Sequence, residues 1–139
     1  MDEAQRELLV PAQIEYLDEV QSFIDDQLAQ AGFSTKTKLK IAIAAEEIFV
    51  NIASYAYAPA SGDVRVRFGL TPEGDAQITF LDSGVPYDPL SRKDPDVTLE
   101  AADRGIGGLG IYMVKKSMDD MRYAYCDGQN RLTLIKKKD

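Results

Sequence analysis

Apolar residues recur at helical spacing in the N-terminal part of the chain. Five of them follow the helical period: Ile14, Leu17, Val20, Ile24 and Leu28. They predict an amphipathic helix of about five turns that ends near Gly32. The run Leu8–Gln13 before it predicts a short first strand, in which Pro11 favours a position at the sheet edge. Ser34 is a candidate N-cap for a second helix.

The second predicted helix is apolar on nearly all sides. From Ile41 to Ala60 the chain reads IAIAAEEIFVNIASYAYAPA, so we expect this helix to be buried on most of its faces. Its middle nevertheless carries Glu46, Glu47 and Asn51. Burying an unpaired carboxylate is costly, so such residues either face a site or reach water at a helix edge.

The hydrophobic period changes to two after residue 60, which predicts strands. Two hairpins are expected, with strands at 64–69, 76–81, 121–126 and 131–135 and a final turn at 127–130. A third helix is expected at Ile111–Met118. Helices beside hairpins predict an α+β fold, a two-layer α/β sandwich with the helices on one face of a mixed, mostly antiparallel sheet.

Composition narrows the classes of function. The 139 residues fit one domain, 1–139, and a net charge of −7 is not that of a general nucleic-acid or membrane-surface binder. The absence of histidine excludes Ser-His-Asp catalysis and His-ligated zinc. The lone Cys126 excludes an internal disulfide. The first residues lack the features of a signal peptide, so we expect a cytoplasmic protein.

Glu47 and Asn51 are the first candidate site. They lie four residues apart on a helix, which places their Cβ atoms about 5–6 Å from each other. The Asn51 carbonyl oxygen suits Mg²⁺, which prefers oxygen ligands, and Glu47 could deprotonate a nucleophile. The alternative is a helix edge at which Glu46 and Glu47 pair with lysines.

The second candidate site is Asp82-Ser83-Gly84, which directly follows a predicted strand. A carboxylate at a strand end can accept a hydrogen bond from an exocyclic amine such as that of adenine. Gly84 would let a flat ring approach the backbone closely. The alternative is an ordinary Asp-Ser-Gly turn.

The third candidate site is the glycine stretch 105–110, with Arg104 in front of it. Exposed backbone N–H groups and the N-terminus of the following helix together favour phosphate. The alternative is a loop that ends in helix N-terminal glycines. Gly105, Gly107 and Gly110 also match G-x-G-x-x-G, but Leu99–Arg104 is a poor strand, so we set a nicotinamide-dependent oxidoreductase aside.

Taken together, the three motifs resemble those of the Bergerat-fold (GHKL) ATPases. Within that group the chain is similar to the single-domain anti-sigma factor serine kinases of bacterial partner-switching systems. The motifs that carry the resemblance read EIFVNIASYAY from Glu47, DSGVPYDP from Asp82 and GLGIY from Gly108. The chain departs from the family pattern at Tyr55, where histidine is common, and it has extra glycines before the third helix.

The resemblance implies a role for each site residue. Asn51 would hold the Mg²⁺ that bridges the triphosphate of ATP, and Glu47 would be the catalytic base. Asp82 would bind the adenine amino group, with Gly84 beside the ring. The phosphates would be held by a lid of Gly105, Gly107, Gly108, Leu109 and Gly110, with Arg104 contacting them. Thr133 would support adenine through water, although the last strand lacks the family's Gly-Thr pair.

The resemblance also implies a function. The chain would phosphorylate a serine of an anti-sigma factor antagonist, using ATP and Mg²⁺, and would bind a sigma factor when the antagonist is phosphorylated. Relatives form homodimers, and neither nucleic acid nor membrane is expected as a direct partner. The alternative is a protein-binding module in which ATP orders the lid for docking and no phosphate is transferred.

Overall fold

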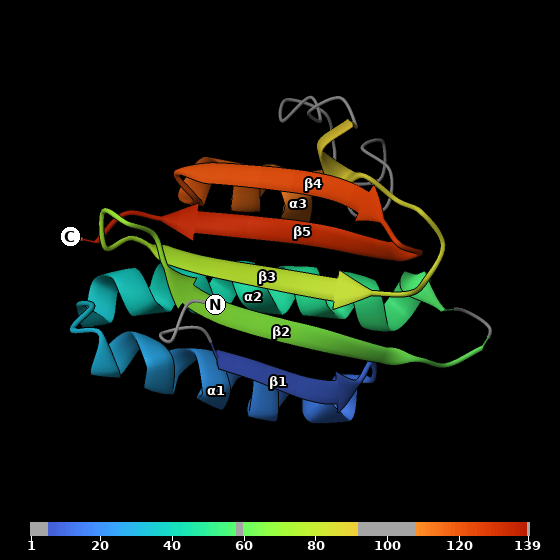
Figure 1. Ribbon diagram of the computed structural model, residues 1–139, viewed down its shortest axis with the longest axis horizontal. Coiled ribbons are helices and arrows are strands. Elements are labelled where there is room, and N and C mark those ends of the chain that lie inside the picture. The colour runs from blue at the N-terminus through green and yellow to red at the C-terminus, as the bar shows by residue number, and fades with distance from the viewer. Residues whose placement is uncertain (1–5, 58–59, 92–107, 139) are drawn as a thin grey trace.

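The computed structural model describes residues 6–57, 60–91 and 108–138. These ranges form two layers, a sheet and a set of helices (Figure 1). The strands are β1 (Arg6–Pro11), β2 (Asp63–Leu70), β3 (Ala76–Asp82), β4 (Asp120–Cys126) and β5 (Gln129–Lys136). The helices are α1 (Leu17–Gln30), α2 (Thr35–Asn51) and α3 (Gly108–Ser117). A 3-10 turn at Ile14–Tyr16 precedes α1, a π-helical turn at Ile52–Ala56 extends α2, and a second 3-10 turn lies at Pro89–Ser91.

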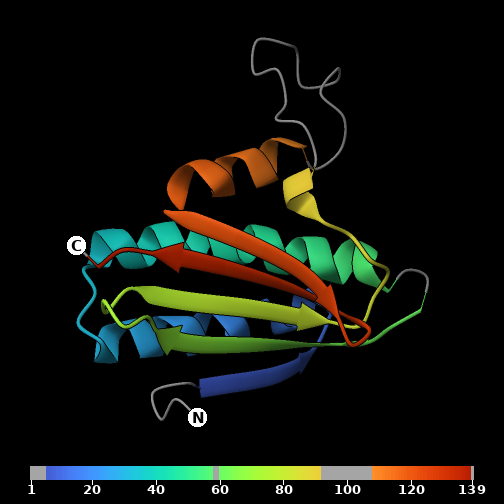
Figure 2. The ribbon, with the colours of Figure 1, turned by 45° about the horizontal axis from the view of Figure 1, so that its top comes forward.

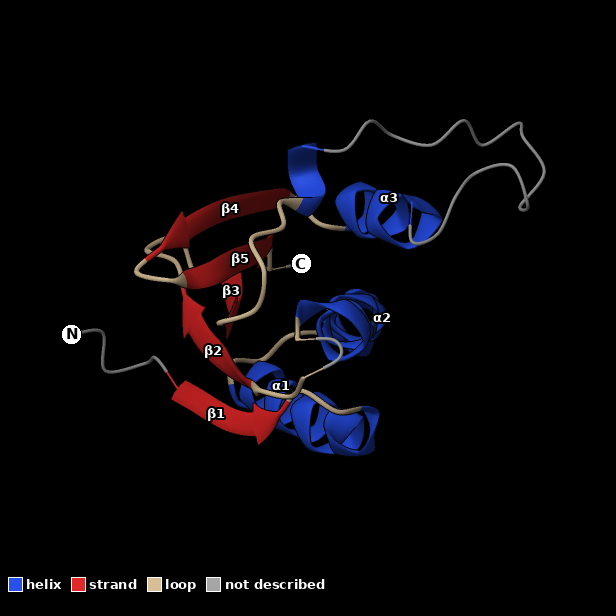
Figure 3. Cartoon of the chain, turned by 90° about the vertical axis from the view of Figure 1, so that its right-hand side faces the viewer, coloured by secondary structure: helices blue, strands red, loops and turns tan. Residues whose placement is uncertain are grey.

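The sheet has the order β1-β2-β3-β5-β4, and each of its strand pairs within the described residues is antiparallel. The predicted α+β sandwich is therefore confirmed, whereas the expected mixed sheet is wrong for these strands. The strand that contains Pro11 lies at a sheet edge, as predicted. The three helices cover the same face, with α1 behind β1, α2 behind the central strands and α3 behind β4 (Figures 1 and 3).

The register of the strands decides which side chains face the helices. Phe80 of β3 lies opposite Val66 of β2 and opposite Leu132 of β5, and this row faces the helices. Because side chains alternate across a strand, the next row along points to the other face of the sheet. That row contains Thr79 of β3 and Thr133 of β5.

The core fills the space between the helices and the sheet. The predicted helical stripe is confirmed in α1, where Val20, Ile24 and Leu28 are at most 1% exposed. Burying each such side chain contributes about 1.5–3 kcal/mol. At the start of α2, the Ser34 hydroxyl accepts a hydrogen bond from the Thr37 N–H at 3.2 Å, which confirms the predicted N-cap.

Two helix predictions need correction. Ile14 lies in the 3-10 turn and is half exposed, so α1 begins at Leu17. The second helix is buried at Ile41, Ala44, Ala45, Ile48 and Phe49, as expected, but one side is open to solvent, where Ile43 is 63% exposed. A helix in a two-layer sandwich turns one side away from the sheet, whatever residues that side carries. None of the described helices is both long and apolar enough to cross a bilayer.

The hairpin between β4 and β5 is tighter than expected. Its turn is the pair Asp127-Gly128, with φ angles of 56° and 76°. Positive φ at both central residues is the mark of a type I′ turn, whose twist matches that of the flanking strands. Residues 129 and 130, which were predicted to lie in the turn, are therefore the first residues of β5. This brings Asn130 into the sheet.

Candidate functional site

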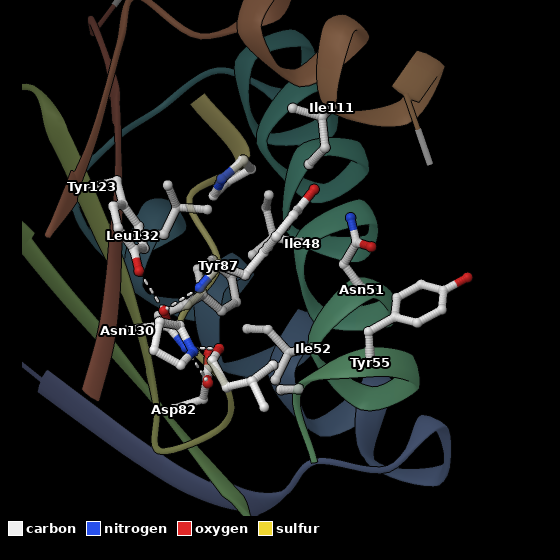
Figure 4. A pocket seen from close by; sticks show the side chains of 15 residues that line it. Ile48, Asn51, Ile52, Tyr55, Asp82, Tyr87, Ile111, Tyr123, Asn130 and Leu132 are labelled. Atoms are coloured by element: carbon white, nitrogen blue, oxygen red, sulfur yellow. Dashed lines mark hydrogen bonds between the residues drawn. The ribbon is translucent and has the colours of Figure 1, made fainter. Parts of the chain in front are cut away.

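A cavity of about 400 Å³ opens between the end of α2 and the sheet (Figure 4). Most of its walls are apolar or aromatic, including Ile48, Ile52, Phe80, Ile111 and Leu132. Its polar groups are few, which is typical of small-molecule pockets of this size. Asp82 and Asn130 lie together on the sheet side of the cavity, and Asn51 projects from α2 on the other side (Figure 4).

Asp82 places a carboxylate in this apolar wall. It is the last residue of β3, and it is 5% exposed. Its Oδ1 accepts hydrogen bonds from the Gly84 N–H at 2.9 Å and from Nδ2 of Asn130 at 3.0 Å. Its Oδ2 has no hydrogen-bond partner within the described residues. A buried carboxylate with one oxygen held and one oxygen available is suited to accept from a ligand N–H group.

Asn130 fixes the orientation of this carboxylate. Its Nδ2 also donates to the Val85 carbonyl at 2.9 Å, and its Oδ1 accepts from the Tyr87 N–H at 3.0 Å and from the Tyr123 hydroxyl. Backbone N–H only donates and backbone C=O only accepts, so these partners determine which side of the amide faces Asp82. Burial raises the pKa of Tyr123, which keeps its hydroxyl protonated as a donor at neutral pH.

The role of Asn130 was missed in the sequence analysis, although the sequence carries a signal for it. Leu132 and Leu134 alternate with Arg131 and Thr133, which places the even-numbered residues of this strand on the core face. Asn130 has the same parity. A polar residue on the core face of a strand is a candidate for a site, because it must find partners there.

Gly84 is required by the packing of the loop after β3. A Cβ atom at this position would collide with the carbonyl group of Ala56. The next residue, Val85, donates its N–H to the same Ala56 oxygen at 3.0 Å. The loop is thereby attached to the π-helical turn at the end of α2. Gly84 itself is not among the residues that line the cavity.

Tyr57 holds the same loop from a second side, a role that was not predicted from the sequence. Its hydroxyl donates to the Asp63 carbonyl at 2.6 Å and accepts from the Ser83 N–H at 2.7 Å. Burial raises the pKa of the Tyr57 phenol, so the donor is retained at neutral pH. A Cβ atom at Gly62 would collide with the ring, so glycine is needed there too. Tyr57 therefore joins the end of α2 to β2 and to the Asp82 loop.

Asn51 lies at the last position of α2 and lines the cavity, as predicted. Its Nδ2 atom is buried and has no hydrogen-bond partner within the described residues. An unsatisfied buried amide costs about 1–3 kcal/mol. This orphaned group fits a site that is completed by a ligand, and the carbonyl oxygen on the same side chain is a suitable donor to Mg²⁺.

Glu47 lies one turn before Asn51 but does not line the cavity. Its carboxylate packs directly against Gly110, where a Cβ atom would overlap the carboxylate group. Gly110 is in the first turn of α3, so the acid lies at the positive end of a helix. Glu47 is partly buried and Glu46 is exposed, so only the former belongs to this contact.

The predicted glycine lid is divided between described and undescribed residues. Gly108, Leu109 and Gly110 form the first turn of α3, and Ile111 in the next turn reaches the cavity wall. Arg104, Gly105 and Gly107 lie outside the described residues.

Thr133 is not brought to the cavity, so its predicted role toward adenine is wrong. It lies on β5 between Leu132 and Leu134, which face the core, and it points to the opposite face of the sheet. Its hydroxyl exchanges a hydrogen bond with the Thr79 hydroxyl at 3.1 Å on that face. The reason is the two-residue period of the strand.

Comparisons with known proteins agree with this architecture. Residues 10–136 match the family described as histidine kinase-like ATPase domain. The serine-protein kinase RsbW of Listeria monocytogenes is 29% identical over 126 residues, which cover 87% of this chain and 80% of that protein. The serine-protein kinase RsbW of Bacillus thuringiensis is 28% identical over 130 residues, which cover 91% and 81%.

Solved structures show the same fold. The crystal structure of the RsbU and RsbW domains of Rv1364c from Mycobacterium tuberculosis superposes with a TM-score of 0.66 and 18% identity over 96% of this chain and 32% of that one. The histidine kinase domain from Erythrobacter litoralis EL346 gives a TM-score of 0.55 at 15% identity, covering 89% and 60%. The family match spans nearly the whole chain, and the chain therefore belongs to the histidine kinase-like ATPase domain family.

Proposed function

We propose that this protein is an ATP-dependent serine-protein kinase of the cytoplasm and an anti-sigma regulatory factor. Its substrate is a serine of an anti-sigma factor antagonist, and the unphosphorylated antagonist competes with a sigma factor for the kinase. Three findings support the proposal. The chain belongs to an ATPase family, it aligns over most of its length with proteins named serine-protein kinases, and it contains an apolar cavity with a carboxylate at its wall.

The observation that carries the proposal is the arrangement at Asp82. Oδ1 is occupied by the Gly84 N–H and by Asn130, whereas Oδ2 has no partner within the described residues. An exocyclic amine of a flat, apolar base supplies the missing donor, and adenine is such a base. The apolar walls then cover the faces of the ring. This arrangement favours adenine over the alternative of an ordinary turn.

The triphosphate end of the proposed site lies toward Asn51 and α3. Asn51 would hold Mg²⁺, which when bound neutralises charge on the phosphates. The N–H groups of Gly108, Leu109 and Gly110 are at a helix N-terminus, which favours anions. Arg104, Gly105 and Gly107 complete the proposed lid.

In the proposed reaction, the substrate serine Oγ forms a bond to the γ-phosphorus of ATP. The bond from that phosphorus to the oxygen bridging to the β-phosphate breaks, and ADP leaves. Glu47 accepts the serine proton. Phosphoryl transfer depends mainly on positioning and on neutralising charge. In the proposed site, Asp82 would position the base, Asn51 would hold Mg²⁺, and Arg104 with the N–H groups at the start of α3 would contact the phosphates.

The test combines labelled ATP, Mg²⁺, the protein and an antagonist protein encoded in the same genome. Label should pass to a serine of the antagonist, and Glu47→Gln should abolish transfer while ATP still binds. Asn51→Ala should remove the Mg²⁺-dependent part of ATP affinity. Absence of ATP binding to the wild type would overturn the proposal.

One observation favours a second candidate, an ATP-gated binding module. The Glu47 carboxylate packs on Gly110 at the start of α3, where it can set the position of that helix without chemistry. For such a module, ATP binds and alters antagonist affinity, but no label is transferred. Glu47→Gln then changes the effect of ATP on antagonist binding and nothing else, which separates the two candidates.

A further inference from the structure

One face of α2 exposes adjacent apolar side chains to solvent. Leu39 is 61% exposed and Ile43 is 63% exposed. Residues four apart on a helix are neighbours on its surface. Isolated exposed apolar residues are common in soluble proteins, but neighbouring ones form a patch that marks an interaction site when it is extended by others.

The patch continues onto α3. The two helices pack side by side and run in opposite directions (Figure 2), and Gly110 of α3 lies against Glu47 of α2. Met113 is three residues further along α3, about 4.5 Å along its axis. Because the helices are antiparallel, this places Met113 at the level of Ile43, and Met113 is 56% exposed.

Lysines border this apolar patch. Lys36 and Lys40 lie on the same side of α2, one turn from Leu39 and Ile43 respectively, and both are exposed. Neither has an ion-pair partner within the described residues, whereas Lys38 pairs with Asp25 at 3.6 Å. On α3, the Lys116 ammonium lies 5.4 Å from the centre of the Tyr112 ring.

Lys36 lies where the helix dipole does not favour a cation. The first turn of α2 carries no acidic residue, and Lys36 there faces the positive end of the helix dipole, which disfavours a cation by about 0.3–1 kcal/mol. Exposed lysines beside an apolar patch, without an ion-pair partner within the described residues, offer charge complementarity to an acidic partner.

We propose that this α2–α3 surface (Leu39, Ile43 and Met113 with Lys36 and Lys40) docks an acidic amphipathic helix of a partner protein. Leu39 and Ile43 lie one turn apart along α2, and Met113 of α3 lies at the level of Ile43. This patch can accept the apolar face of a helix, with side chains at i, i+3, i+4 and i+7. Carboxylates beside that stripe pair with the lysines.

An anionic membrane fits this surface less well than an acidic helix does. Glu46 lies three residues after Ile43 and is exposed, and it would be repelled by anionic headgroups. A protein partner can match a single carboxylate with a single basic residue. The surface lies apart from the nucleotide cavity, and the proposal does not depend on the proposed kinase function.

The test uses two fluorescent synthetic helical peptides of about 18 residues, or five turns. Both carry the same leucine stripe, and one has glutamates and the other lysines at the flanking positions. Fluorescence anisotropy should show the acidic peptide binding the intact protein at least about tenfold more tightly, a difference of about 1.4 kcal/mol, and less tightly at high salt. Ile43→Ser should weaken this binding about tenfold.

Two further variants make the result specific. The double variant Lys36→Glu/Lys40→Glu should reverse the preference toward the basic peptide. Leu9→Ser, at a residue that is 52% exposed on the opposite face of the sheet, is the matched control and should change nothing. Equal binding of both peptides, or no effect of Ile43→Ser, would overturn the proposal. Binding to phosphatidylglycerol vesicles without binding of the acidic peptide would also overturn it, in favour of a membrane.

Discussion

The two faces of the sheet each hold a carboxylate, and the two carboxylates differ in burial and in their hydrogen-bond partners. On the helix-covered face, Asp82 is 5% exposed and is held by one amide and one backbone N–H. The opposite face of the sheet, which the three helices do not cover, is called the open face. There, Glu7 of β1 accepts hydrogen bonds from Arg65 and Arg67 of β2, each at 2.7 Å. Both of its oxygens are occupied, and its side chain is 36% exposed.

The difference follows from alternation along the strands. Alternate residues point either to the covered face, which contains the cavity, or to the face that contacts water. On the open face, each charge finds a partner or water, and an exposed ion pair contributes at most about 1 kcal/mol. On the covered face, the Asp82 carboxylate is stabilised by the hydrogen bonds that Asn130 and the Gly84 N–H donate to one of its oxygens. In the proposed site, the oxygen without a partner within the described residues would be the group that selects the base.

The largest effect is expected for Asn130→Ala. The variant removes four hydrogen bonds, which Asn130 makes with the Asp82 carboxylate, the Val85 carbonyl, the Tyr87 N–H and the Tyr123 hydroxyl. Of these residues, Asp82 is buried, at 5% exposed. We expect a loss of about 3 kcal/mol or more in the free energy of unfolding and loss of ATP binding. Denaturant unfolding and calorimetric titration measure the two. The control is Arg131→Ala, at the exposed neighbouring position; equal effects of both variants would contradict the comparison.

Asp82→Asn tests the free oxygen directly. Replacing the acceptor of a charge-assisted hydrogen bond should weaken ATP binding by about 10- to 100-fold. Inorganic triphosphate, which has no base, should bind as before. The matched control on the open face is Asp120→Asn, which removes an exposed pair with Arg122 and should leave both affinities unchanged. Equal weakening of ATP and triphosphate would remove Asp82 from the base-binding end of the site.

Tyr57→Phe tests the support of the Asp82 loop. The variant keeps the ring against Gly62 but removes the hydroxyl that bonds to Asp63 and Ser83. We expect a loss of about 1–2 kcal/mol in stability and a several-fold weaker affinity for ATP but not for triphosphate. Tyr16→Phe is the control, because Tyr16 precedes α1 and does not line the cavity. If Tyr57→Phe binds ATP as tightly as the wild type does, the Tyr57 hydroxyl does not position the Asp82 loop.

The fold was predictable because its periods are clear. Helical spacing identified α1, alternation identified the strands, and Ser34 identified the start of α2. The outward face of α2 was not predictable in the same way. A segment that is apolar on all sides carries no information about which side meets the sheet, so the exposure of Ile43 had to come from the packing.

Site residues that belong to a local sequence motif were predictable. Residues whose place depends on where a strand begins and how it pairs were not. Asp82 and Asn51 were identified from the sequence, and the structure brings both to one cavity. Asn130 was missed because a four-residue turn was assumed where the type I′ pair Asp127-Gly128 suffices. Thr133 was assigned from the family resemblance against the alternation of its strand, which places it on the face away from the cavity. Tyr57 acts through atoms far along the chain, which no local pattern indicates.

Thr133→Val tests whether a change on the open face of the sheet leaves the cavity on the other face unaffected. Thr133 and Thr79 exchange one hydrogen bond on that face, at 3.1 Å, so its loss should reduce stability by about 0.5–1.5 kcal/mol. ATP affinity should not change, because the side chain points away from the cavity. Isothermal titration of the variant checks this, and a clear loss of affinity would show that the two faces are not independent.

The smallest effect is expected for Glu7, and it depends on pH. The hydrogen bond from Arg67, with that from Arg65, holds the pKa of Glu7 below its usual value. A carboxylate with a lowered pKa in the folded state adds stability above its unfolded pKa of about 4.3, and this contribution is lost as the pH falls through the folded value. Glu7→Gln should therefore be less stable than the wild type by under about 1 kcal/mol near pH 7, and the gap should close as the pH falls below about 4. Thermal unfolding from neutral to acidic pH measures the gap. If the difference in stability between the wild type and Glu7→Gln persists unchanged at low pH, Glu7 contributes by packing and not by its charge. The open face would then be less solvated than its exposed ion pairs indicate.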